Sequence, residues 1–150
     1  MIIGSPKELQ AGEKRVAMTP ASASQLLKLG FECIIETGAG VEAGFSDADY
    51  KAAGVKIIKT ASNLWKQSDV IIKVQAVNKV EEAYLNKDKT VISFFWPAQN
   101  KELLDRLVSS GCSQIAIDMV PRISRAQKMD ALSSMANIAG YRAVIEAGNH

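Results

Sequence analysis

Short apolar segments alternate with helical patterns along most of this chain, and that alternation restricts its fold more than any other feature. Six segments rich in Val and Ile are expected as strands, at residues 1–5, 31–36, 55–58, 69–74, 90–95 and 112–118. Helices are expected between them at 19–29, 47–53, 62–66, 78–85 and 101–110. Nearly continuous apolar strands that alternate with helices are typical of βαβ units. We therefore predict an α/β domain over residues 1–120, a three-layer parallel sheet with Rossmann-like or flavodoxin-like topology.

The size and composition of the chain indicate one soluble globular domain. It has 150 residues, of which 47% are hydrophobic and 23% are charged. A net charge of +2 without a long basic run gives no indication of nucleic-acid binding. The apolar runs fall well short of the roughly 20 residues of a membrane span, and no signal peptide is expected at the N-terminus. Cys33 and Cys112 lie among apolar residues without a C-x-x-C spacing, so we expect free thiols in a reducing compartment.

The longest helical pattern covers the end of the chain, and we predict one long helix over residues 121–148. Ser124 and Gln127 match an S-x-x-Q capping box, and Gly148 is expected to end the helix. About 22 helical residues would span about 33 Å at 1.5 Å per residue. One face of this helix is apolar and small, and a second, with Lys128, Arg142 and Glu146, is a solvated face in which Met135 is an exception.

The third face of this helix is polar, yet it carries almost no charge. Its members are Gln127, Asp130, Ser134, Asn137 and Tyr141, with Ser133 at its edge. Solvated faces usually carry Lys and Glu, whereas short hydrogen-bonding groups more often line a ligand site or a polar interface. At the head of the helix Arg122 is able to pair with the Asp130 carboxylate and Gln127 to hold an amide group. Gln127 has an alternative role as the capping partner of Ser124.

Three further side chains are expected beyond the carboxyl ends of the strands, where such sheets bind ligands. Arg15, between the first strand and the first helix, is either an anion-binding group or a solvated loop residue. Lys73 ends an otherwise apolar strand, and either points into the crevice or extends its ammonium group to solvent. Trp96 follows the fifth strand and is expected to pack or to form a pocket wall.

A glycine-rich segment at residues 38–43, G-A-G-V-E-A, matches the loose dinucleotide pattern G-x-G-x-x-[GA] after a strand. We interpret it as a structural turn, because no helical pattern opens directly after it to face a pyrophosphate. The next strand ends at Lys59, without an acidic residue to hold a ribose. We therefore predict a domain without a dinucleotide glycine loop. The only histidine is His150, so no histidine-based acid/base chemistry is expected, and no metal cluster, P-loop or nucleophile elbow is present in the sequence.

Several segments together resemble one known family. They are K-E-L-Q-A-G-E-K-R-V-A-M-T-P, D-V-I-I-K-V, S-F-F-W-P-A-Q-N and, above all, M-V-P-R-I-S-R-A-Q-K-M-D-A-L-S-S. Over essentially all 150 residues, the chain is similar to the N-terminal part of the alpha subunit of proton-translocating NAD(P)+ transhydrogenases, in the alanine dehydrogenase/transhydrogenase family.

This resemblance implies a complete subunit with two α/β domains, of which the second binds NAD(H). Residues 1–120 would be the first domain, and the helix at 121–148 would lead to an NAD-binding domain that this chain does not contain. The implied activity is hydride transfer from NADH to NADP+, with NADP(H) on a partner component and coupling to proton translocation through a membrane component. The isolated chain is then expected to be inactive. Family contacts to the nicotinamide end fall on Arg122, Gln127, Asp130 and Ser133. A homodimer, peripheral on the cytoplasmic side of the bacterial inner membrane, is also implied.

The similar alanine dehydrogenases are an alternative. Resemblance to them implies that Arg15 and Lys73 hold pyruvate, but Trp96 takes the place of their catalytic histidine. Deamination needs such an acid/base group, whereas hydride transfer between two nicotinamides needs only close placement. The sequence therefore favours the transhydrogenase. A further alternative is a non-catalytic binding or assembly module, in which Arg15 and Lys73 have no remaining role.

Overall fold

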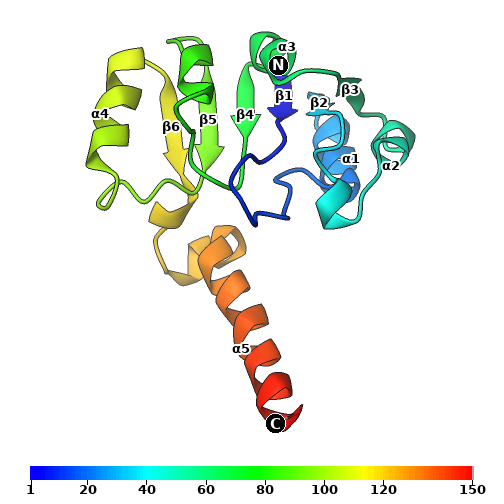
Figure 1. The fold of residues 1–150 in the computed structure, drawn as a ribbon, viewed down its shortest axis with the longest axis vertical. Coiled ribbons are helices and arrows are strands. Elements are labelled where there is room, and N and C mark those ends of the chain that lie inside the picture. Colours follow the sequence, from blue (N-terminus) through cyan, green and yellow to red (C-terminus); the bar gives the residue numbers. More distant parts are fainter. Residues whose placement is uncertain (150) are drawn as a thin grey trace.

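The structure, a computed structural model, describes residues 1–149, so the prediction about His150 lies outside the described residues. All of the predicted strands form: β1 (Ile2–Ser5), β2 (Glu32–Glu36), β3 (Lys56–Ile58), β4 (Val70–Ile72), β5 (Thr90–Ser93) and β6 (Ser113–Ala116). They pair in parallel in the order β3-β2-β1-β4-β5-β6, as Figure 1 shows. This is the strand order of doubly wound dinucleotide-binding folds, and it confirms the predicted α/β architecture.

Four helices connect these strands: α1 (Pro20–Lys28), α2 (Asp47–Ala52), α3 (Ala61–Gln67) and α4 (Lys101–Ser110). Local sequence determines where the first two begin. Thr19 and Ser22 form a capping box ahead of α1, with a proline in the first turn, and Ser46 and Asp49 form another ahead of α2. The glycine-rich segment 38–43 leads only into a 3-10 turn, η1 (Val41–Ala43), and α2 begins later, as expected for a structural turn.

The helix predicted at 78–85 is wrong, because only a short 3-10 turn, η2 (Glu81–Tyr84), forms there. The Asn78 side chain accepts hydrogen bonds from the backbone N–H groups of Val80 and Glu81. The Glu81 carboxylate in turn accepts from the Asn78 N–H at 3.0 Å. Such side chain–backbone bonds compete with the helical ladder, and here they fix a turn instead.

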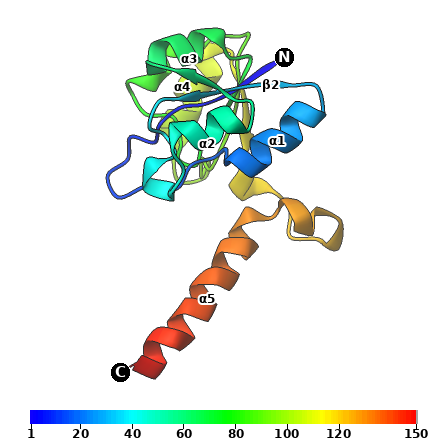
Figure 2. The ribbon, with the colours of Figure 1, turned by 90° about the vertical axis from the view of Figure 1, so that its right-hand side faces the viewer.

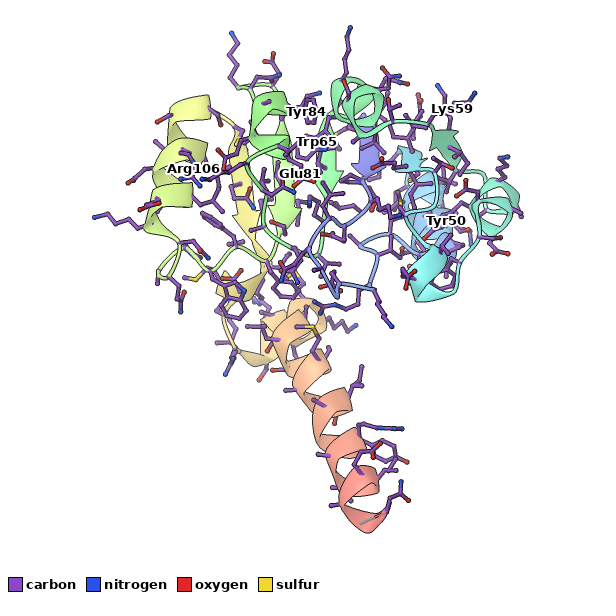
Figure 3. All side chains as sticks on the ribbon, in the orientation of Figure 1. Tyr50, Lys59, Trp65, Glu81, Tyr84 and Arg106 are labelled. Atoms are coloured by element: carbon purple, nitrogen blue, oxygen red, sulfur yellow. The ribbon has the colours of Figure 1, made fainter. Side chains whose placement is uncertain are left out.

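Helices cover the two faces of the sheet unequally. On one face, α3 and α4 bury Trp65, Leu103 and other apolar side chains against the sheet. The ring of Trp65 packs at a tilt against that of Tyr84 in η2, with centroids 5.9 Å apart (Figure 3). On the other face, α1 and α2 pack over β1 and β2, where the buried Tyr50 hydroxyl donates to a backbone carbonyl at 2.7 Å. The same face of β4, β5 and β6 presents neighbouring isoleucines that are half-buried or, at Ile115, 48% exposed. The expectation of a sheet covered on both faces is therefore met only in part within residues 1–149.

The long helix begins later than predicted. Residues Ser124–Met129 form a 3-10 helix, η4, without a side-chain cap, so the Ser124–Gln127 capping box is wrong. The α-helix, α5 (Ala131–Asn149), has 19 residues and continues past Gly148. Its cap is Asp130, whose carboxylate accepts from the backbone N–H of Ser133 at 2.9 Å. Aspartate caps as well as serine does, and its charge also favours the positive end of the helix dipole.

Figures 1 and 2 both show α5 leading away from the sheet. Only Ala131, Leu132 and Met135 of its first two turns are half-buried, and nearly all later residues are exposed. Its apolar side chains Ile138, Tyr141 and Val144 are each about 70% exposed (69%, 73% and 74%). Within residues 1–149, no helix has the combination of length and hydrophobicity that crossing a membrane requires.

Candidate functional site

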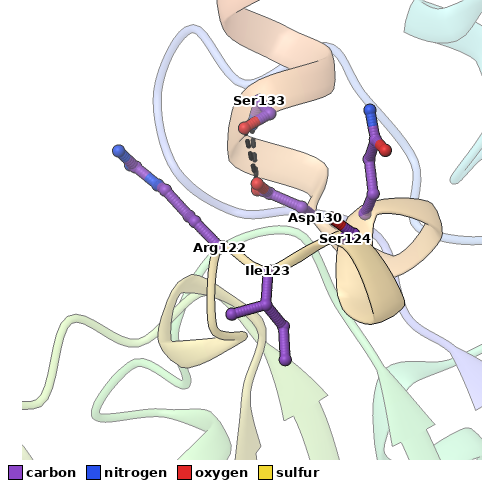
Figure 4. Close-up of a pocket in the computed structure, with 6 residues that line it drawn as sticks. Arg122, Ile123, Ser124, Asp130 and Ser133 are labelled. Carbon is purple, nitrogen blue, oxygen red and sulfur yellow. Dashed lines mark hydrogen bonds between the residues drawn. The ribbon is translucent and has the colours of Figure 1, made fainter.

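A polar pocket of about 240 Å³ lies where the chain turns from the sheet into α5 (Figure 4). It is lined by Arg122, Ile123, Ser124, Gln127, Asp130 and Ser133. Arg122 comes from the segment that follows β6 and the 3-10 turn η3 (Ile117–Met119), Gln127 from η4, and Ser133 from the first turn of α5. The four residues that the sequence singled out at the head of the helix therefore share one pocket, although a bend separates η4 from α5. Their functional role stays a prediction.

Asp130 and Ser133 form the fixed part of this pocket. Besides its bond to the Ser133 N–H, the Asp130 carboxylate accepts from the Ser133 hydroxyl at 2.5 Å (Figure 4). These hydrogen bonds, together with the nearby charge of Arg122, hold the pKa of Asp130 below its usual range. Asp130 is only 6% exposed, so the pocket has an ionised carboxylate whose position is fixed by the helix it caps.

Arg122 and Gln127 are the free part of the pocket. Across residues 1–149, neither side chain forms a hydrogen bond or an ion pair with the protein. The suggested pairing of Arg122 with Asp130 is wrong for this structure, because Ser133 already occupies the Asp130 carboxylate and Arg122 extends away from that pair (Figure 4). The pocket therefore offers a guanidinium and a carboxamide whose hydrogen-bonding groups are open to a ligand.

Lys73 is neither a free cation of the crevice nor a lysine that reaches solvent. Its Nζ lies 2.5 Å from a carboxylate oxygen of Glu81 and 3.7 Å from one of Glu8, and its side chain is 1% exposed. Glu8 also accepts from the N–H groups of Val74, at 2.6 Å, and Gln75, at 3.3 Å, while burial raises the pKa of Glu8. The alternative in which Lys73 extends its ammonium group to solvent is therefore wrong, and its role in a site stays a prediction. A buried ammonium is retained only with such partners, and no sequence pattern around Lys73 indicates that Glu8 and Glu81 supply them.

Lys73 nevertheless contributes to the wall of a second pocket, of about 280 Å³, beside the start of α5. The other residues that line it are Ala17, Ile72, Val74, Ile92, Phe94, Ile117 and Ala131. Because the ammonium is already neutralised by carboxylates, this pocket is an apolar cavity with little available charge.

Arg15 is held by its own loop. Its Nε donates to one Glu13 carboxylate oxygen at 2.7 Å and its Nη2 to the other at 2.6 Å. Gln75 adds a third bond to Glu13, at 2.6 Å. The hydrogen bonds from Arg15 lower the pKa of Glu13 to about 2. Arg15 is thus an ion-paired residue rather than a freely solvated one, and it lies outside the polar pocket.

Trp96 has an unusual backbone conformation for a bulky residue, with φ of 54°. The carboxylate of Asp118 accepts from the N–H groups of Phe95, at 2.7 Å, and Trp96, at 3.1 Å, and so joins the loop after β5 to the turn after β6. The indole stacks on Phe94 with ring centroids 6.3 Å apart and is 43% exposed. The expectation of a packed or wall-forming tryptophan is met by this stack, and Asp118 is the residue that sequence reasoning missed.

The fold and the pocket together define an α/β domain with a doubly wound sheet and a polar site at the base of its exit helix. Residues 4–139 match the family described as "Alanine dehydrogenase/PNT, N-terminal domain", and the chain belongs to this family. It is 61% identical over 150 residues to the NAD(P) transhydrogenase subunit alpha of Cereibacter sphaeroides, covering 100% of this chain and 29% of that protein.

A solved structure and a second relative agree with this assignment. A transhydrogenase from Sinorhizobium meliloti superposes with a TM-score of 0.93 at 38% identity, over 99% of this chain and 44% of that one. The alanine dehydrogenase of Mycolicibacterium smegmatis is more distant, with 35% identity over 93% of this chain and 37% of that protein. The chain thus spans less than half the length of the relatives it matches.

Proposed function

We propose that this chain is the N-terminal domain of a NAD(P) transhydrogenase alpha subunit and that its polar pocket holds the nicotinamide end of NAD(H). The observation that carries the proposal is the pocket itself, in which the side chains of Arg122 and Gln127 have no partner among residues 1–149 and Asp130 is fixed and ionised. The 61% identity to a transhydrogenase alpha subunit supports it.

The residues of the pocket fit a nicotinamide chemically. Its carboxamide has one carbonyl acceptor and an NH₂ donor, and the Arg122 guanidinium and the Gln127 amide supply matching donors and an acceptor. A pocket of about 240 Å³ accommodates the ring and its carboxamide, and leaves the remainder of a dinucleotide to be bound elsewhere. The absence of a dinucleotide glycine loop agrees with a division of labour in which a following domain binds most of the NAD(H).

The charges of the pocket suit hydride donation. When bound, the reduced nicotinamide ring of NADH supplies a hydride and becomes positively charged. A fixed carboxylate at Asp130 favours positive charge nearby, and its geometry needs no reorganisation because Ser133 already holds it. Arg122 and Gln127 would orient the ring, and close placement of donor and acceptor is the main requirement of direct transfer.

The rest of the proposed assembly follows from the family. NADP(H) would be held on a partner component, with a membrane component that couples transfer to proton translocation. The uncovered sheet face at Ile115 and the exposed apolar side chains of α5 support packing by the remainder of the subunit, beginning with an NAD-binding domain that follows α5. A homodimer located on the cytoplasmic side of the bacterial inner membrane belongs to the same proposal.

The experiment compares Arg122→Ala and Asp130→Asn in the complete alpha subunit, reconstituted with its NADP-binding component. We expect each substitution to slow hydride transfer from NADH far more than it weakens NADH binding. Arg125→Ala is the matched control, because Arg125 lies on η4 but does not line the pocket. Unchanged turnover in both pocket variants, or an equal loss in the control, would exclude the proposed site.

The alternative activity is decided in the same preparations. Turnover of pyruvate, ammonia and NADH would show an alanine dehydrogenase, and none is expected, because Trp96 occupies the position of the acid/base histidine that the family resemblance assigns to those enzymes.

A further inference from the structure

Met135 is the one residue of the solvated face of α5 that the proposed function does not explain. Its neighbours on that face, Arg142 and Glu146, form an ion pair with each other on the helix surface. Met135 instead turns its sulfur toward the sheet domain, where the Arg15 Nη1 donates to its Sδ at 2.8 Å. An apolar side chain on this face is therefore explained by a contact with a residue 120 positions earlier in the chain.

Arg15 is prepared for this contact by the domain. Both of its other nitrogens are held by the Glu13 carboxylate, whose side chain is 6% exposed, and Gln75 holds the same carboxylate from the loop after β4. The guanidinium is planar, so fixing two of its nitrogens also fixes the direction in which Nη1 points. Glu13, Gln75 and Arg15 thus form a rigid bracket that projects one N–H group at α5.

The contact lies where it controls the direction of α5. Beyond the second turn nearly all residues of the helix are exposed, whereas Ala131, Leu132 and Met135 in its first two turns are half-buried. Ala131 and Leu132 immediately follow the bend at Asp130, so contacts there fix where α5 starts but leave its direction relative to the sheet open. Met135 lies one further turn along the helix, and a contact there restricts the swing of all that follows. A thioether is a weak hydrogen-bond acceptor, so the contact is also easily released.

We propose that Arg15 is a positioning residue that sets the angle at which α5 leaves the domain, through Met135, and so sets how the following chain meets the polar pocket. The proposal rests on the proposed function, in which a domain after α5 carries most of the NAD(H). The guanidinium of Arg15 contacts a carboxylate and a sulfur of its own chain while its side chain remains 49% exposed, and the anion-binding role stated from the sequence stays a prediction.

The first test measures the angle directly. In a background with Cys33→Ala and Cys112→Ser, spin labels at Lys59→Cys on the sheet domain and Ala147→Cys on α5 report their distance by pulsed electron resonance. We expect a single narrow distribution whose width at least doubles on Arg15→Gln. Met135→Ala should widen it equally, and the double variant should widen it no further, because both remove the same contact. Arg142→Gln is the matched control on the same helix and should change nothing. An unchanged width in Arg15→Gln overturns the proposal.

The second test measures the consequence in the complete enzyme. We expect Arg15→Gln to lower the rate of hydride transfer about tenfold while the KM for NADH changes less than about twofold, because misplacement affects reaction more than binding. Arg15→Lys should recover part of the rate. A widened distance distribution with an unchanged rate overturns the positioning role. Failure of the proposed function is distinguishable, because it would appear as unchanged transfer in Arg122→Ala, whereas the distance measurement does not depend on any cofactor.

Discussion

Replacing Asp130 separates the structural and the chemical roles of one buried carboxylate. Asp130 caps α5 through two hydrogen bonds from Ser133, at 2.9 and 2.5 Å, and also lines the polar pocket. Asp130→Ala removes the cap and the charge together. Asp130→Asn removes the charge and keeps a side chain that caps a helix about as well as aspartate does.

The size of the effect follows from how little else supports the helix. Loss of an N-cap side chain costs about 1 kcal/mol, and loss of a negative charge at a helix N-terminus costs about 0.3–1 kcal/mol. Because α5 has few contacts with the domain beyond its second turn, these losses fall on the helix itself. We expect Asp130→Ala to lower the free energy of opening the first turn by about 1.5 kcal/mol, which is about a tenfold change in the opening equilibrium. Asp130→Asn should lower it by about 0.5 kcal/mol.

Amide hydrogen exchange measures this opening residue by residue. The amides of the first turn of α5 should exchange about ten times faster in Asp130→Ala and only about twice as fast in Asp130→Asn. The amides of α4 serve as an internal reference, because that helix packs on the opposite part of the sheet through Leu103 and Leu107. If Asp130→Asn exchanges as fast as Asp130→Ala, the capping role is wrong. If hydride transfer in the complete enzyme survives Asp130→Asn, the chemical role of the charge is wrong.

Three further predictions concern the stability of the domain. Tyr50→Phe leaves a buried carbonyl without its 2.7 Å donor and should cost about 1–3 kcal/mol in chemical denaturation. Hydrogen bonds from Arg15 hold the pKa of Glu13 at about 2, below its usual 4.5. Ionised Glu13 therefore stabilises the fold above pH 4.5, and this stabilisation is lost as the pH falls toward 2. In Glu13→Gln the midpoint of chemical denaturation should change less with pH between 4.5 and 2 than it does in the unchanged protein. Lys73→Met leaves the buried Glu81 carboxylate unpaired and should cost about 3–5 kcal/mol, whereas Lys73→Met combined with Glu81→Gln should recover part of that loss.

The sheet was predictable because its signal is local. Each strand is a short apolar run, and residues such as Ile71 and Val91 are fully buried in the register that an apolar run requires. Alternation with helices then leaves few topologies, and the observed strand order is one of the two that the pattern suggested. The prediction of a helix at 78–85 was wrong for the converse reason. The hydrogen bonds that fix a turn there are made by the Asn78 side chain, and no periodic pattern of the sequence indicates them.

The polar pocket was predictable only in part. Arg122, Gln127, Asp130 and Ser133 were selected by a polar helix face and by family resemblance, and the structure brings them to one pocket. The predicted polar face requires one continuous helix, whereas Gln127 lies on a 3-10 helix before the bend at Asp130. The sequence also contains a competing cap, the D-x-x-S pattern of Asp130 and Ser133, six residues after the S-x-x-Q pattern that was chosen as the helix start.

Two of the contacts around Lys73 and Arg15 were beyond prediction, because their partners are distant in sequence. Nothing local relates Glu8 to Lys73 or Gln75 to Glu13, each more than 60 residues apart, although both pairs meet at the carboxyl edge of β4. From the sequence alone an acidic residue in a loop is expected to be solvated, and only the topology shows that a cation lies beside it.

The ion pairs of this edge distinguish it from the polar pocket at the base of α5. The carboxyl edge of this sheet, where related folds bind phosphate, is occupied here by Glu8, Lys73, Glu13 and Arg15 in contacts with one another. The two cations that the sequence singled out at this edge, Arg15 and Lys73, are therefore both ion-paired. Arg122, by contrast, lines the polar pocket at the base of α5 and forms no ion pair within residues 1–149. Under the two proposals made above, the domain would hold one end of the ligand and direct α5, and the direction of that helix would be set at Asp130 and Met135.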